Sequence, residues 1–145
     1  MKKLLLLVVI AIAAYVGYEQ QHPPFSEVPA AGTARNVSVL ASAFKNHASG
    51  IQVQGQGLVS KVLADDNEGS RHQRFVVRLS SGQTILIAHN IDLAPRIPAL
   101  SEGDVVEFNG EYEWSAKGGV VHWTHHDPAD HHPPGWLKHH GKTFQ

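Results

Sequence analysis

The central part of the chain alternates between apolar and polar residues, and this alternation predicts β-strands. Residues 72–80, HQRFVVRLS, show the pattern clearly. Phe75, Val77 and Leu79 fall on one face of an extended chain, while basic and polar side chains fall on the other. A period of two residues indicates a strand with one buried face. The same period occurs in four further segments, which are residues 51–63, 84–90, 105–114 and 120–126.

The order of the five predicted strands is that of an OB-fold barrel. Turn-forming clusters separate most of them, at residues 64–70, 80–83 and 115–119. The longest connection, residues 91–100, contains two prolines and lies between the third and the fourth strand. A three-stranded meander, an insertion and a closing hairpin match this fold, and Gly55 and Gly57 permit the first strand to coil. The sequence therefore predicts an all-β fold, a small five-stranded OB-like β-barrel, with a small β-sandwich as the rival architecture.

The segments on either side of the barrel have other patterns. Residues 37–48 (VSVLASAFKNHA) place apolar side chains on one helical stripe, which predicts a short N-terminal helix. Residues 19–36 are rich in Pro, Gly and Ala and show no period, so we expect a linker.

The C-terminal segment, residues 127–145, is expected to fold back and cover one mouth or edge of the barrel. It contains Trp136 and Phe144, whereas disordered tails are poor in aromatic residues. We therefore expect a single OB-like domain over residues 37–145, with the short helix at 37–48, the barrel at 51–126 and the covering tail at 127–145.

The first eighteen residues have the composition of an export signal. Lys2 and Lys3 precede an unbroken apolar run over residues 4–16, which is shorter than the roughly 20 residues that cross a bilayer. Residues 1–18 therefore predict a cleaved signal peptide or, as the alternative, an uncleaved N-terminal anchor in the inner membrane. Both alternatives place the rest of the chain on the periplasmic or extracellular side.

Charge and cysteine content narrow the function. The 145 residues carry a formal net charge of −1 and contain no cysteine. A protein that binds duplex DNA needs a basic surplus to displace counterions, so nucleic acid is not the expected partner. Without cysteine, disulfides, thiolate metal ligands and thiol nucleophiles are excluded.

Seven of the 11 histidines lie in residues 122–140, HWTHHDPADHHPPGWLKHH. The candidate metal ligands in this segment, for zinc or another divalent metal, are His122, His125, His126 and Asp127. In a regular strand His122 and His126 lie about 13 Å apart and His125 points to the opposite face. A shared ion therefore requires the strand to bend or end near Thr124, and Asp127-Pro128 is a candidate source of that break. Without it, the histidines form a solvated run.

A second candidate site lies where the second strand begins and the third ends. Its residues are Arg71, His72, Arg74, His89, Asn90 and Asp92. This face of an OB barrel is the usual ligand platform, and guanidinium groups suit an anionic or sugar-like ligand. The alternative is an ordinary solvent face. We interpret the acidic stripe of the fourth strand, Glu107, Glu111 and Glu113, as a solvated outer face.

Four phrases of the sequence also carry a resemblance. They are GSRHQRFVVRLSSGQTILIAHNIDLAPRI (69–97), GDVVEFNGEYEW (103–114), GGVVHWTHHDP (118–128) and GWLKHHGKTFQ (135–145). Together they resemble a family of small exported bacterial proteins known as a domain of unknown function. The resemblance implies that these residues form one unit, and it implies no activity. The architecture more distantly resembles periplasmic OB-fold stress proteins that bind small ligands, a likeness of fold alone.

Two functions from different classes follow. The first is an exported or membrane-tethered binding module with a small polar or anionic ligand on the platform. The second is a metal-dependent hydrolase of phosphodiesters or nucleic acid, with the candidate metal ligands named above and His72 or His89 as general base. The hydrolase requires imidazoles of the third and fifth strands within about 4–5 Å of each other. A third hypothesis, metal buffering by the C-terminal histidines, requires no defined site.

Overall fold

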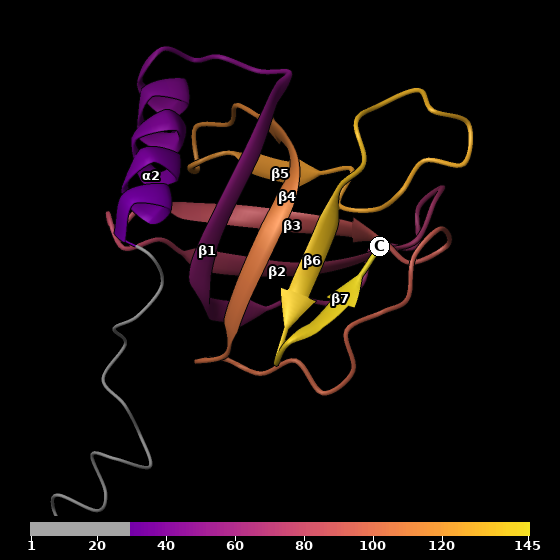
Figure 1. Ribbon diagram of the computed structural model, residues 1–145. Coiled ribbons are helices and arrows are strands. Elements are labelled where there is room, and N and C mark those ends of the chain that lie inside the picture. Colours follow the sequence, from indigo (N-terminus) through magenta and orange to yellow (C-terminus); the bar gives the residue numbers. More distant parts are fainter. Residues whose placement is uncertain (1–29) are drawn as a thin grey trace, which may run out of the picture. The chain divides into compact units, whose positions relative to one another are not determined.

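The computed structural model describes residues 30–145, which contain one helix and seven strands (Figure 1). The expected export segment 1–18 and residues 19–29 of the expected linker lie outside the described residues. The elements are α2 (Ala30–Lys45), β1 (Ile51–Val62), β2 (His72–Arg78), β3 (Thr84–Asn90), β4 (Val105–Glu113), β5 (Val120–His122), β6 (Trp136–His139) and β7 (Lys142–Phe144). No helix in this described part has the length and apolarity that crossing a bilayer requires.

Five of the strands close into a barrel, as the sequence predicts. β1 pairs antiparallel with both β2 and β4, and β2 pairs antiparallel with β3. The ring is completed by β5, which is parallel to β3 and antiparallel to β4. This is the strand order of an OB-like barrel, and it excludes the rival β-sandwich. Gly55 permits close packing inside the barrel, because a Cβ there would lie 2.6 Å from the Phe108 ring.

Alternate side chains of these strands form the core. Phe75 of β2, Ile87 of β3 and Phe108 and Tyr112 of β4 are fully buried, and each such side chain stabilises the fold by roughly 1.5–3 kcal/mol. The residues between them point outward. Consequently Glu111 and the other alternate residues of β4 lie half-buried on its outer face.

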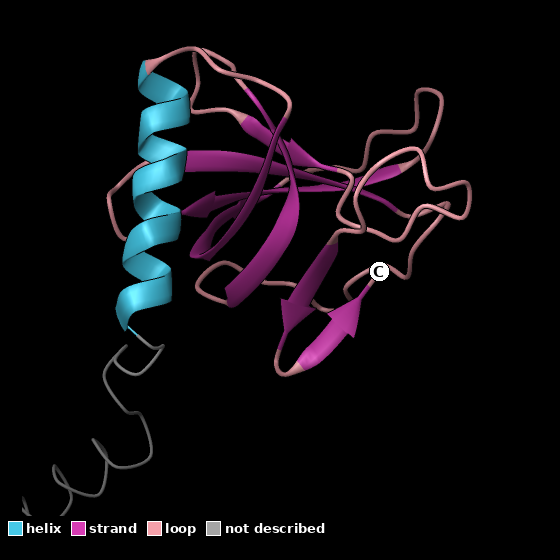
Figure 2. Cartoon of the chain, turned by 45° about the horizontal axis from the view of Figure 1, so that its top comes forward, coloured by secondary structure: helices cyan, strands magenta, loops and turns pink. Residues whose placement is uncertain are grey.

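Helix α2 packs on the barrel near the end of β4 (Figure 2). Leu40 is buried in the common core, and the Trp114 indole donates a hydrogen bond to the Phe44 carbonyl oxygen at 3.1 Å. The helix spans Ala30–Lys45 and thus begins and ends earlier than the expected range 37–48. It ends where His47 adopts a left-handed φ of 51°, which closes the last turn as in a Schellman motif.

The C-terminal segment folds back as predicted. β6 pairs antiparallel with the first half of β4, from Val106↔His139 to Asn109↔Trp136, and β7 pairs with β6. Leu137 is fully buried and Phe144 is 2% exposed, so this hairpin extends the barrel's core. β4 therefore changes its partner along one edge, from β6 over residues 106–109 to β5 over residues 111–113.

Candidate functional site

The histidine-rich segment bends immediately after β5. The strand ends at His122, and Trp123 adopts a φ of 50°, which residues with a side chain rarely do. Two glycines make room for this path. A Cβ at Gly135 would overlap the carbonyl oxygen of Trp123, and a Cβ at Gly110 would overlap that of His122. The bend that a metal site requires is therefore present, but it lies at Trp123 and not before Pro128.

This bend disperses the expected metal ligands. His125 is only 2% exposed, and its Nδ1–H donates to the carbonyl oxygen of His126 at 2.9 Å. The His126 side chain is exposed. Asp127 caps the following turn, because its two carboxylate oxygens accept the backbone N–H groups of Ala129 and His131. The last of the four, His122, stays on the outer face of the barrel.

Other groupings bring potential ligands together. Among residues 30–145, two sets of three His, Asp or Glu side chains have ligand atoms within 4.8 Å of one another. We call them the β5 triad, Glu111–Glu113–His122, and the β6 triad, Asp104–His139–His140. No three of the four residues predicted as metal ligands form such a set in this part of the chain.

The β5 triad arises from the pairing of β4 with β5. Glu111 pairs directly with His122 across the two strands, and Glu113 lies two residues further along the same face of β4. His122 Nε2 is 3.9 Å from Glu111 Oε1 and 3.9 Å from Glu113 Oε1. Both distances exceed that of a hydrogen bond, and this nitrogen is buried without any partner.

Burial makes charge unfavourable on two members of the β5 triad. Desolvation and the adjacent Glu113 carboxylate raise the pKa of Glu111. Desolvation lowers the pKa of His122, although the Glu113 carboxylate opposes this. A cation placed between these groups would offset both effects, since it favours the carboxylate and the neutral imidazole.

A group of three aromatic rings adjoins the β5 triad through Trp123. The Trp123 indole lies 4.8 Å from the His122 ring, measured between ring centroids. His132 stacks on the same indole, with centroids 4.5 Å apart and the planes 9° from parallel. The edge of the buried His125 ring completes this group, 5.1 Å from His132.

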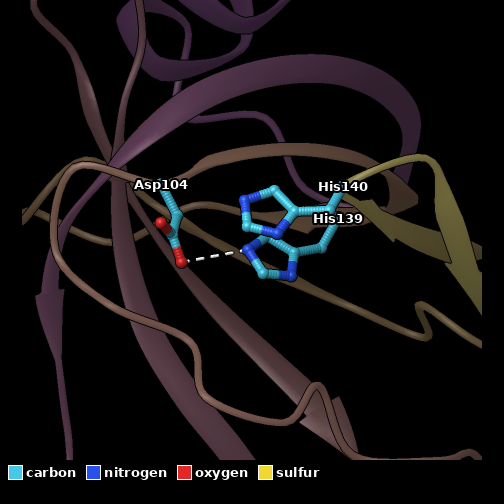
Figure 3. Close-up of side chains that lie close together, drawn as sticks. All are labelled: Asp104, His139 and His140. Atoms are coloured by element: carbon cyan, nitrogen blue, oxygen red, sulfur yellow. Dashed lines mark hydrogen bonds and ion pairs between the residues drawn. The ribbon is translucent and has the colours of Figure 1, made fainter.

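The β6 triad is internally satisfied (Figure 3). Asp104 Oδ2 accepts the Ser101 backbone N–H at 2.9 Å and the His139 Nε2–H at 2.9 Å. The Ser101 N–H and the His139 imidazole lower the pKa of Asp104, against the effect of desolvation. His140 stacks on His139 with a centroid separation of 3.9 Å. These contacts hold the turn before β4 against the C-terminal hairpin. The β6 triad therefore stabilises the fold.

The residues of the expected ligand platform form hydrogen bonds within the protein. Arg71 donates to both carboxylate oxygens of Asp92, from its backbone N and its Nε at 2.7 Å each. Arg74 donates from Nε and Nη2 to the Ala64 carbonyl oxygen. His72 and Asn90 bond to the backbone of neighbouring residues, at Ser70 O and Asp92 N. The structure thus brings Arg71 and Asp92 together, but as a loop contact.

His89 belongs to the interior. It is fully buried, its Nε2–H donates to the Pro95 carbonyl oxygen at 3.1 Å, and its Nδ1 accepts from the Thr124 hydroxyl at 2.8 Å. Burial lowers the pKa of His89 from 6.5 to about 4. Gln73 acts similarly, since its amide bonds both the N–H and the carbonyl oxygen of Ile97. These two side chains attach the long 91–100 connection to the barrel.

The family membership is settled by a match along most of the chain. A family model matches residues 25–145, which include every described strand and both triads. The chain belongs to this family. It is described as "Protein of unknown function (DUF3465)", so the resemblance seen in the sequence is confirmed and adds no activity. No curated protein matches the chain.

The sequence does not predict that Glu111 and Glu113 lie beside His122. It assigned both to a solvated face, although the SAKGG turn at residues 115–119 indicated a hairpin. In a hairpin, residues on the same face of the two strands become neighbours. Folding the fourth and fifth predicted strands about this turn would have placed the two glutamates opposite His122.

Proposed function

We propose that the protein is a non-enzymatic binding module for a divalent transition metal ion, held by Glu111, Glu113 and His122. The observation that carries the proposal is the His122 Nε2 atom, which is buried, has no hydrogen-bond partner and faces two carboxylates. A buried polar atom without a partner costs free energy and calls for an explanation. The other such atom among the described residues, Asp65 Oδ1, belongs to a carboxylate that already pairs with Arg96.

The geometry fits a small divalent ion. Zinc binds imidazole nitrogen and carboxylate oxygen at about 2.0–2.2 Å, so two ligand atoms of a tetrahedral site lie roughly 3.4 Å apart. The two separations of 3.9 Å in the β5 triad are close to this value. Shortening each of these two separations by about half an ångström gives the tetrahedral value, and all three ligand atoms lie within 4.8 Å of one another. Imidazole with carboxylate favours zinc and similar transition metals over calcium or magnesium.

The triad's place in the fold also supports a binding role. Parallel pairing of Ile87 with Val121 puts Ala88 of β3 beside His122 on the outer face. Ala88 in turn pairs with Arg74 of β2. The β5 triad is therefore continuous with the face of β2 and β3 that OB folds commonly use for ligands.

The alternative function, a metal-dependent hydrolase, has less support. A general base needs a free ring nitrogen within reach of the reacting group. Both nitrogens of His89 are engaged and its pKa is about 4, so of the two expected bases only His72 keeps a ring nitrogen, Nε2, outside its bond to Ser70 O. The proposal that a polar or anionic ligand binds at the platform has less support as well, because Arg71 and Arg74 each already use part of their guanidinium donors within the protein.

We also propose that the module works outside the cytoplasm, after export or while tethered by residues 1–18. The support is the basic start and the apolar run of this segment. Fractionation of cells that produce the full chain, with mass measurement of the mature N-terminus, distinguishes a cleaved signal from an anchor. Recovery of the intact chain from the cytoplasm would contradict the proposal.

The metal proposal is tested by titrating zinc into the full chain and measuring stoichiometry and affinity by calorimetry. We expect one equivalent to bind, and His122→Ala and Glu113→Gln to reduce the affinity at least tenfold. Glu107→Gln is the matched control, because Glu107 lies on the same face of β4 and pairs with Lys138, away from the triad. Absence of zinc binding, or equal binding by all variants, would overturn the proposal.

A further inference from the structure

The connection between β5 and β6 holds a histidine that the β5 triad does not include. Hydrogen bonds fix this loop at two places, since Asp127 accepts the N–H groups of Ala129 and His131, and the Gly135 N–H donates to the His125 carbonyl oxygen. Between these fixed points the loop presents His132.

Trp123 contacts both His132 and one member of the triad. The indole lies 4.8 Å from the His122 ring and stacks on the His132 ring at 4.5 Å, measured between ring centroids. Both imidazoles therefore contact the same indole.

The hydrogen bonding of His132 prepares one ring nitrogen for coordination. Its Nδ1 lies 2.8 Å from the Pro133 carbonyl oxygen, which can only accept, so Nδ1 carries the proton. Nε2 then bears the lone pair. Metal-binding histidines usually donate their other ring N–H to a carbonyl or carboxylate oxygen, because this fixes the tautomer and the ring orientation.

We infer that His132 is the fourth ligand of the β5 triad's metal ion, carried to it by the loop between β5 and β6. This inference rests on the proposed metal binding and deepens it. Two imidazoles and two carboxylates complete a tetrahedral coordination sphere. Closed four-ligand sites retain metal, whereas catalytic zinc sites keep a position for water. The ring leaves its stacked position on Trp123 when it coordinates, so the indole reports metal binding.

The test compares the full chain with His132→Ala and His132→Phe. The phenyl ring preserves stacking on Trp123 but has no ligand atom, so this variant separates coordination from packing. His131→Ala is the matched control, because its exposed neighbouring side chain only adjoins Asp127. Zinc affinity is measured by competition with a chromogenic chelator, coordination by cobalt(II) visible absorption, and Trp123 by fluorescence, with Trp123→Phe identifying its share of the signal.

We expect both His132 variants to bind zinc more weakly by at least roughly 10- to 100-fold. This is the loss that follows from removing the hydrogen-bond partner of a metal ligand. The intense tetrahedral cobalt absorption should fall in both, and His131→Ala should match the wild type. Wild-type affinity and cobalt spectrum in His132→Phe would overturn the role of His132 and leave the proposed metal binding standing. Failure of the wild-type chain to bind zinc or cobalt would overturn both.

Discussion

The β5 triad joins β4, and the β6 triad joins the turn before β4, to histidines of the C-terminal third, yet the two are built in opposite ways. In the β6 triad, His139 Nε2 donates to Asp104 at 2.9 Å, and the same carboxylate also accepts a backbone N–H. In the β5 triad, His122 Nε2 is 3.9 Å from each of two carboxylates and has no partner. Two groups of similar residues thus differ in their hydrogen bonds. The hydrogen-bonded group stabilises the fold, and the unpartnered nitrogen of the other group is the basis of the proposed metal site.

We expect the largest loss of stability from a substitution that disturbs the bend after His122 and leaves the β6 triad intact. A methyl group in Gly135→Ala would overlap the Trp123 carbonyl oxygen and lie 2.7 Å from that of Asn109. Relieving this overlap requires the bend after His122 to move, at a cost of about 3 kcal/mol. Urea unfolding measures the loss. Gly141→Ala is a control of the β7 turn, where a Cβ meets no atom within 4 Å but φ is 76°. Equal stability of Gly135→Ala and the wild type would contradict the account of the bend.

His89 adds to the comparison an imidazole that is fully buried and has both ring nitrogens in hydrogen bonds. The pKa of His89 is about 4 in the folded protein and near 6.5 in the unfolded chain, so the unfolded state binds the proton first. The resulting stability is present above pH 6.5 and is lost as the pH falls toward 4. This difference in pKa corresponds to a loss of roughly 3 kcal/mol in the free energy of unfolding.

Urea unfolding at pH 7 and at pH 4.5 measures this dependence. His89→Gln keeps a polar group but does not titrate, so its stability should change less between the two values. A wild-type protein as stable at pH 4.5 as at pH 7 would disprove the role of His89. Carboxylates with lowered pKa values, such as Asp104, contribute to the change only below about pH 4.

The smallest effects give the most direct contrast, because they differ in sign. Asp104→Asn removes the charge that receives two hydrogen bonds, and it should destabilise the metal-free protein by about 1–3 kcal/mol. Glu111→Gln relieves the repulsion from Glu113 and the desolvation of a carboxylate. It should leave the metal-free protein unchanged or more stable by up to about 1 kcal/mol.

Thermal unfolding in the presence of a chelator, with and without added zinc, compares these two amide variants. Zinc should stabilise Asp104→Asn as it does the wild type, and it should stabilise Glu111→Gln less. If Glu111→Gln were the more destabilised of the two without metal, Glu111 would have a structural role and the distinction between the triads would be lost.

The barrel could be predicted because its determinants are local. Strand alternation, turn clusters and the single long connection each occupy a short stretch of sequence, and together they define the strand order. The ends of elements were harder. Residues 30–36 contain glycine and threonine and looked like linker, yet they are helical in the structure. The end of α2 depends on His47 in a left-handed conformation that glycine normally adopts.

The candidate site was predicted in part. The sequence indicates His122 as a candidate ligand, but the partners it suggests are neighbours in sequence, and the structure places Glu111 and Glu113 beside it instead. The bend at Trp123 depends on Gly110 and Gly135, which are distant in the chain, and no local pattern reveals such a contact. The expected platform was assigned by residue type, and the sequence did not show that Arg71 and Arg74 would be engaged by Asp92 and Ala64.

The change of partner along β4 has a consequence for how the protein folds. β4 pairs with β1, as in Ile51↔Tyr112, and also with the C-terminal β6. Pairings between segments so far apart in sequence form late and slowly, because the entropy of closing long loops must be overcome first. The first half of β4 cannot complete its hydrogen bonds until β6, Trp136–His139, is available. The barrel and the proposed metal site, which need only β5, can therefore form before the C-terminal hairpin docks on β4.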